Sequence, residues 1–91
     1  MEEAIQKEEK LIGKVTHFFN KIGVAVLELT KDSLKVGETI HFKGGERDFE
    51  QKVESMQIEH NEVSEAKKGE SFGLKVEQAV REGDQVFKVL E

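Results

Sequence analysis

The sequence predicts a small all-β domain, and three observations support this prediction. Short apolar segments alternate with polar residues at the two-residue period of a half-buried strand. Turns that contain Gly or Asn separate these segments at nearly regular spacing. The chain has no proline, so none interrupts a strand. Such a succession of short strands is typical of a closed barrel or a sandwich.

One domain is expected, over residues 10–91. A chain of 91 residues has the length of a single domain. Residues 1–9 are rich in Glu, Lys, Ala and Gln, which favour a helix, but an isolated helix this short is marginal in water. We therefore expect residues 1–9 to be a flexible or short helical N-terminal tail.

The first strands are expected to form a hairpin. Residues 10–19 and 22–29 have strand-like patterns, and Asn20-Lys21 between them favours a tight turn. Gly37 then ends a turn at positive φ and leads into a strand over residues 39–43. In that strand Ile40 and Phe42 alternate with His41, which places His41 on the solvent side.

The later strands follow the same logic. Gly44-Gly45 indicates a hairpin turn with both glycines at positive φ. The return strand, about residues 48–59, changes its apolar parity after Val53, which predicts a β-bulge near residues 54–55. Residues 63–66 are expected to be a connector. Turns at 67–69 and 81–84 then precede strands over 71–76 and 86–90.

Composition excludes several functions. The formal net charge of −5 disfavours non-specific attraction to nucleic acid. The absence of cysteine excludes thiol nucleophiles, Fe–S clusters and cysteine zinc sites. With no membrane-length apolar stretch and no signal-peptide pattern, this favours the cytoplasm and no membrane contact.

The residues give no sign of catalysis. His17, His41 and His60 are the three histidines, and their spacing matches no metal-binding motif. No nucleophile-elbow motif is present. We therefore expect no enzyme activity, no metal and no cofactor.

The first hairpin is the preferred binding surface. Phe18 and Phe19 are adjacent on a strand and must point to opposite faces, so only one can enter the core. The other is either exposed, where an aromatic ring can stack on a base, or covered by a loop or by the tail. Lys14, His17 and Lys21 lie near this hairpin in sequence.

A second candidate surface is the turn at Lys67-Lys68. Together with Lys75 it would form a small cationic patch that could hold a phosphate. The alternative is an ordinary solvated turn.

The order of these segments resembles domain 2 of the translational GTPases, the β-barrel that follows the GTPase domain in elongation factor Tu. The matching segments are Gly23-Val24-Ala25-Val26, Leu34-Lys35-Val36-Gly37-Glu38, Val53-Glu54-Ser55-Met56, Ala66 to Leu74 and Gly83-Asp84-Gln85-Val86. The resemblance spans roughly residues 12–89 and implies a small closed antiparallel Greek-key barrel of six to seven strands. The family's GxxxxGK[ST] phosphate loop is absent, so GTP is not expected as a ligand.

The resemblance also implies a function. Glu70 matches the tRNA-binding member, whereas Ser71 and Lys75 stand where that member has Asn and Leu. We expect a non-catalytic, translation-factor-like accessory module that binds tRNA, ribosomal RNA or a translation-associated complex. The alternative is a protein-interaction module that docks to a separately encoded enzyme without RNA contact. The candidate binding residues are Lys14, His17, Phe18, Phe19, Lys21, Lys67, Lys68, Glu70, Ser71 and Lys75.

Overall fold

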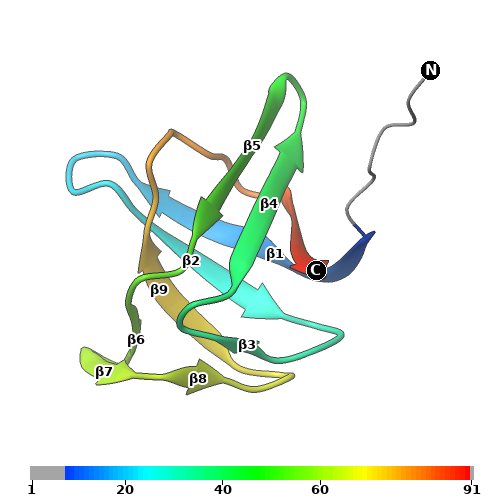
Figure 1. Cartoon of the computed structure of the whole chain (residues 1–91). Coiled ribbons are helices and arrows are strands. Elements are labelled where there is room, and N and C mark those ends of the chain that lie inside the picture. Colours follow the sequence, from blue (N-terminus) through cyan, green and yellow to red (C-terminus); the bar gives the residue numbers. More distant parts are fainter. Residues whose placement is uncertain (1–7, 91) are drawn as a thin grey trace.

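The structure, a computed structural model, describes residues 8–90 (Figure 1). All regular structure in this range is β-strand, which confirms the predicted all-β class. Within residues 8–90 no helix is long and apolar enough to cross a membrane. Residues 1–7 of the expected tail lie outside the described residues, and Glu8 and Glu9 already belong to the first strand.

Ten strands form between residues 8 and 90. They are β1 (Glu8–Phe19), β2 (Val24–Leu29), β3 (Leu34–Lys35), β4 (Thr39–Gly44), β5 (Arg47–Lys52), β6 (Met56–Ile58), β7 (Asn61–Val63), β8 (Glu65–Ala66), β9 (Ser71–Lys75) and β10 (Gln85–Leu90).

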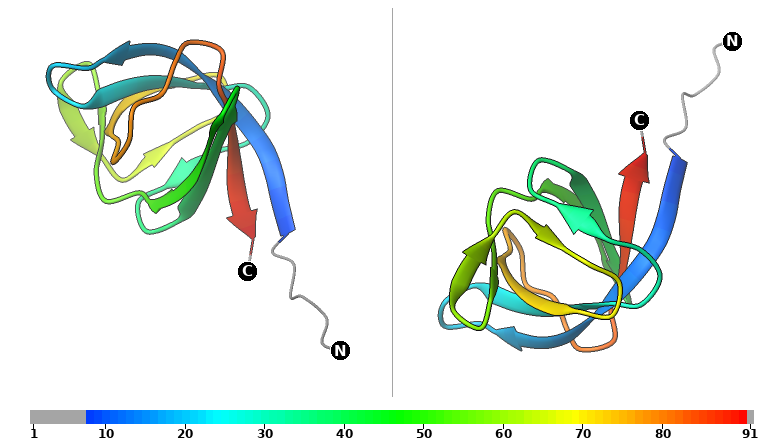
Figure 2. Two further views of the ribbon diagram at one scale, coloured as in Figure 1. Left: turned by 90° about the horizontal axis from the view of Figure 1, so that it is seen from above. Right: turned by 90° about the horizontal axis from the view of Figure 1, so that it is seen from below.

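Eight of these strands form one antiparallel sheet in the order β5-β4-β10-β1-β2-β9-β6-β7, and β3 pairs with β8 in a separate ribbon. The sheet curls around the core (Figure 2), but its end strands β5 and β7 are not paired with each other. The prediction of a closed barrel is therefore wrong. The predicted number of six to seven strands is too low, because the short strands β3, β7 and β8 lie where turns and a connector were expected.

Strand β1 is the longest strand and pairs with both β10 and β2. Its register shifts between Leu11 and Gly13 against β10, and between Val15 and His17 against β2. Irregularities of this kind bend a strand, which lets one strand serve two differently oriented parts of the sheet. Gly13 lies so close to β2 that a Cβ atom there would be 2.2 Å from the carbonyl oxygen of Glu28.

The predicted long return strand is two strands. β5 ends at Lys52 and pairs with β4, whereas β6 begins at Met56 and pairs with β7 and β9. The change of apolar parity after Val53 thus marks a corner between two parts of the sheet, and the expected bulge within one strand is wrong. Both sides of the corner still bury their apolar residues, since Val53 and Met56 are almost fully buried.

The core lies inside the curled sheet. Its largest fully buried side chains include Phe42, Phe72, Ile12, Leu27, Leu29, Leu34, Ile40 and Met56. Phe42 stacks on Phe49 across the β4–β5 pair, with ring centroids 5.0 Å apart. This stack fixes the β4–β5 hairpin on one side of the core.

Two turn details correct the sequence prediction. In the β4–β5 turn only Gly45 has a positive φ, of 55°, whereas Gly44 belongs to β4. A Cβ atom at Gly44 would meet the Asp84 carboxylate at 2.1 Å, so this glycine makes room for a side chain. At Gly37 the predicted positive φ is confirmed, with a value of 99°.

Candidate functional site

The β1–β2 hairpin ends in an exposed apolar tip. Its turn spans residues 20–23, and the carbonyl oxygen of Phe19 accepts hydrogen bonds from the amides of Ile22 and Gly23, at 3.2 and 2.9 Å. Gly23 adopts a φ of 68°, which favours glycine. Because the turn is longer than predicted, Ile22 lies in it and outside the strand. Ile22 is 63% exposed and Phe19 is 49% exposed.

A hollow of about 350 Å³ lies between this hairpin tip and the β6–β7 hairpin. We call it the hairpin groove. Its lining residues are Phe19, Ile22, Val24, Val26, Gln57, Glu59, His60, Ser71, Phe72 and Gly73. Glu59 and His60 form the β6–β7 turn, both at positive φ, and bring a polar rim to an otherwise apolar floor. An apolar surface with a polar rim is typical of a protein docking site.

The structure separates the two phenylalanines. Phe18 packs against the core, and Phe19 points away from it. His17 stacks beside Phe19 with ring centroids 6.1 Å apart and an angle of 16° between the planes. Of the alternatives for the second ring, substantial exposure is therefore the observed one.

The other sequence-predicted residues do not form one surface. Ser71 lines the hairpin groove, whereas Lys75, at the other end of β9, does not. Lys14 of β1 lies 4.0 Å from Glu28 in an exposed ion pair, and Lys21 lies exposed in the hairpin turn. The candidates thus fall on different parts of the sheet.

The turn at Lys67-Lys68 is also separate from Lys75. β9 lies between them, and five strand residues span roughly 13 Å. The carboxylate of Glu70 accepts a hydrogen bond of 2.8 Å from the Lys67 amide, so Glu70 stabilises its own turn. The cationic patch of Lys67, Lys68 and Lys75 is therefore not assembled.

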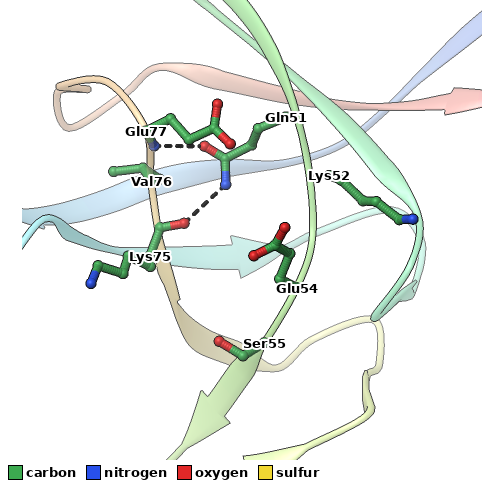
Figure 3. A pocket seen from close by; sticks show the side chains of 7 residues that line it. All are labelled: Gln51, Lys52, Glu54, Ser55, Lys75, Val76 and Glu77. Atoms are coloured by element: carbon green, nitrogen blue, oxygen red, sulfur yellow. Dashed lines mark hydrogen bonds between the residues drawn. The ribbon is translucent and has the colours of Figure 1, made fainter.

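Lys75 instead lies in a second hollow, of about 320 Å³, between β5 and the segment after β9 (Figure 3). The Gln51 side chain crosses this hollow. Its amide nitrogen donates to the carbonyl oxygen of Lys75 at 2.9 Å, and its amide oxygen accepts from the Glu77 amide at 2.9 Å. One side chain thus connects β5 to the opposite part of the sheet, where no backbone pairing exists. We call this the Gln51 bridge.

A polar cluster missed by sequence reasoning covers the outer side of β4. Contrary to prediction, His41 is buried, with 9% of its surface exposed. Its Nδ1 atom lies 2.6 Å from the Glu9 carboxylate, and Nε2 is hydrogen-bonded to Asp48. Burial disfavours the charged ring, but these two hydrogen bonds outweigh it and raise the pKa of His41. The hydrogen bond between Asp48 and His41 also lowers the pKa of Asp48.

A second missed interaction links the β4–β5 hairpin to the turn before β10. Arg47 donates two hydrogen bonds to the buried carboxylate of Asp84, at 2.6 and 2.7 Å. The Arg81 amide donates a third, at 3.0 Å. The hydrogen bonds from Arg47 lower the pKa of Asp84. Burial of the carboxylate acts in the opposite direction but has the smaller effect. This geometry is structural, since the carboxylate is enclosed by its own donors.

Comparison with known proteins adds relatives of a different kind from those expected. No family model matches the chain. It is 47% identical over 81 residues to an uncharacterized protease of Methanocaldococcus jannaschii and 29% identical over 83 residues to a collagenase of Porphyromonas gingivalis. These matches cover 88% and 90% of this chain but only 20% and 23% of the two relatives. The chain thus spans about a fifth of the length of its curated relatives.

The fold has solved counterparts. Two crystal structures of the C-terminal domain of a Geobacillus thermoleovorans protein named as a U32 peptidase match it, one of them a selenomethionine variant. Their TM-scores are 0.81 and 0.79, with 22% and 21% sequence identity. They cover 87% and 85% of this chain and 91% and 96% of the solved domains.

These findings overturn the translation-factor resemblance. The sequence relatives are named as proteases, and the structural neighbours are domains of a protein named as a peptidase. The expected translation-factor role and its tRNA or ribosomal RNA partners are therefore wrong. The segments that suggested them are short glycine turns that open strands, and many small β-domains need such turns for purely conformational reasons.

Proposed function

We propose that this chain acts as a non-catalytic accessory domain of a U32-type peptidase and packs against the peptidase's catalytic region through the hairpin groove. The names of the sequence relatives and the fold of the solved domains support the peptidase context. The share of the relatives that the chain matches, about a fifth, supports an accessory part. Of the two functions expected from the sequence, docking to an enzyme fits better than RNA binding, although that alternative assumed a separately encoded enzyme.

The exposed apolar tip is the observation on which the proposal rests. Phe19 and Ile22 both line the hairpin groove and are largely exposed, although contact of apolar side chains with water is unfavourable. Burying such a side chain at an interface contributes roughly 1.5–3 kcal/mol when it starts fully exposed. Aromatic and aliphatic anchors of this kind dominate the energetics of protein interfaces.

The geometry of the described residues also supports a non-catalytic role. No serine hydroxyl within residues 8–90 is hydrogen-bonded to a histidine ring, and the most buried carboxylate, Asp84, is enclosed by Arg47 and Arg81. In the hairpin groove, His60 lies on a turn beside Glu59, and Ser71 is the lining residue that carries a hydroxyl group. These groups suit the rim of a docking surface.

A chimera tests the proposal. This chain replaces the matched 81-residue segment of the Methanocaldococcus relative, and amide hydrogen exchange is compared between the chimera and the isolated chain. We expect slower exchange in the chimera for the peptide that covers residues 17–26. The substitution Ile22→Asp should remove that protection, because a carboxylate in an apolar contact weakens docking by at least roughly tenfold, about 1.4 kcal/mol.

Val36→Asp is the matched control. Val36 is also aliphatic, lies in a turn and is 40% exposed, but it does not line the hairpin groove. It should leave the protection unchanged. Equal exchange of residues 17–26 in the chimera and the isolated chain, or equal effects of the two substitutions, would refute docking through this surface.

A further inference from the structure

The polar cluster on the outer side of β4 consists of Glu9, His41, Asp48 and Glu50. These residues come from β1, β4 and β5, and β10 lies between β1 and β4 in the sheet. Glu50 is the register partner of His41 on one side, and Phe87 of β10 is its partner on the other. The fold therefore brings residues 32 positions apart, Glu9 and His41, into direct contact.

The arrangement of ligand atoms in this cluster is the first observation. One atom each from Glu9, His41 and Glu50 lie within 4.8 Å of one another. Tetrahedral zinc with bonds near 2.0–2.1 Å separates its ligand atoms by roughly 3.4 Å. His41 Nδ1 and the Glu9 carboxylate are 2.6 Å apart, so an ion would require these two atoms to separate and the exposed Glu50 carboxylate, within 4.8 Å, to approach them.

The surroundings of the imidazole are the second observation. Both ring nitrogens face carboxylates, Glu9 at Nδ1 and Asp48 at Nε2, and the ring is buried against Phe87 with centroids 6.4 Å apart. A ring that contacts a carboxylate through each nitrogen has its orientation fixed. A carboxylate on the second nitrogen is also the usual orienting partner of a metal-bound histidine.

Charge is the third observation. Glu9, Asp48 and Glu50 bring three carboxylates to one imidazole. Lys43 of β4 lies nearby, with its Nζ over the Phe87 ring, 5.4 Å from the centroid. A divalent cation would be attracted to carboxylates gathered in this way.

From these observations we propose that Glu9, His41 and Glu50 form a binding site for a divalent transition-metal ion, with Zn²⁺ as the best fit. Nitrogen and carboxylate oxygen are both ligands that zinc accepts, whereas Mg²⁺ and Ca²⁺ prefer oxygen alone. The ion takes the place of the proton between Nδ1 and Glu9. That proton leaves to solvent, and the Nε2 proton stays in the hydrogen bond to Asp48. The site is independent of the proposed docking function, because it lies on β1, β4 and β5, away from the hairpin groove.

Calorimetric titration of the untagged 91-residue chain with ZnCl₂ tests the site. We expect one ion per chain in the micromolar range and at least tenfold weaker binding of MgCl₂. Glu50→Gln should weaken zinc binding at least tenfold while the far-UV circular dichroism spectrum stays unchanged, since Glu50 is exposed. His41→Gln should abolish binding.

Two matched variants serve as controls. Glu62→Gln removes an exposed carboxylate on β7, and His60→Gln removes another histidine, both outside the cluster. Neither should change the affinity for zinc. In proton NMR spectra the ring signals of His41 should move on zinc addition and those of His17 and His60 should not. The proposal fails if the unmodified chain does not bind zinc, if Glu50→Gln binds as tightly as the unmodified chain, or if His60→Gln is the variant that loses binding.

Discussion

Gly13→Ala should strongly destabilise the domain. A Cβ atom at this position would lie 2.2 Å from the carbonyl oxygen of Glu28 and 3.2 Å from the Cα atom of Leu29. Both are backbone atoms of β2, which pairs with β1 at Gly13 and with β9 on its other side, so they cannot move without opening the sheet. Overpacking against side chains costs roughly 1–3 kcal/mol. We expect about 3 kcal/mol here, because the obstacle is backbone.

Gly73→Ala is the matched control for that substitution. Gly73 also lies inside a strand, β9, but a Cβ atom there would meet nothing closer than Val24 Cγ1 at 3.7 Å. This is ordinary contact, and alanine in place of a strand glycine restricts the unfolded chain. We therefore expect a change between zero and about 1 kcal/mol of stabilisation.

Urea unfolding followed by far-UV circular dichroism measures both variants, since the chain has no Trp or Tyr for fluorescence. For a domain of this size, 3 kcal/mol corresponds to a fall in melting temperature of roughly 12–24 °C. The free energy of unfolding of Gly13→Ala could instead lie within about 1 kcal/mol of the value for the unmodified chain, or Gly73→Ala could be equally destabilising. Either result would show that the close approach of β1 to β2 does not require glycine at position 13.

Two further predictions concern polar contacts. Gln51→Leu removes the side-chain partners of the Lys75 carbonyl and the Glu77 amide. At roughly 0.5–1.5 kcal/mol for each net hydrogen bond, we expect a loss of about 1–3 kcal/mol in urea unfolding; a loss below about 0.5 kcal/mol would show that the Gln51 bridge does not stabilise the fold. Asp84 has a folded pKa below its ordinary value of 3.8, so its contribution to stability is present above that value and is lost as pH falls through the folded pKa. Asp84→Asn should therefore be less stable than the unmodified chain at pH 7, and the gap should narrow below pH 4 when urea midpoints are compared; a gap independent of pH would contradict this.

The positions of most long strands along the sequence could be predicted because they depend on local chemistry. The alternation around Ile40 and Phe42 indicates which side of β4 faces the hydrophobic core, and Gly37 is at the positive φ that its turn requires. The parity change after Val53 was also a correct signal of an irregularity. Its interpretation was wrong because a bulge and a corner produce the same local pattern, and only the partners of β5 and β6 distinguish them.

The candidate sites were less predictable because they depend on contacts between distant strands. His41 is covered by residues of three other strands, Glu9 of β1, Asp48 of β5 and Phe87 of β10. No residue near His41 in sequence signals the approach of β1. The two-residue period of a strand predicts that one ring of the Phe18–Phe19 pair leaves the core, but it does not tell which one. Ile22 was missed because the hairpin turn is longer than the Asn20-Lys21 pair suggested.

The pairing of β1 with β10 has a consequence for how the domain folds. Glu8 is the register partner of Leu90, so the first described strand pairs with the last one (Figure 2). A newly made β1 can form its hairpin with β2 at once, but its other edge stays unpaired until β10 has been synthesised. Contacts of such long sequence separation carry a large loop-closure entropy and slow folding into the range of milliseconds to seconds. During that interval the unpaired edge of β1 can pair with strands of other chains, so synthesis and folding of β10 limit the time in which this edge can aggregate.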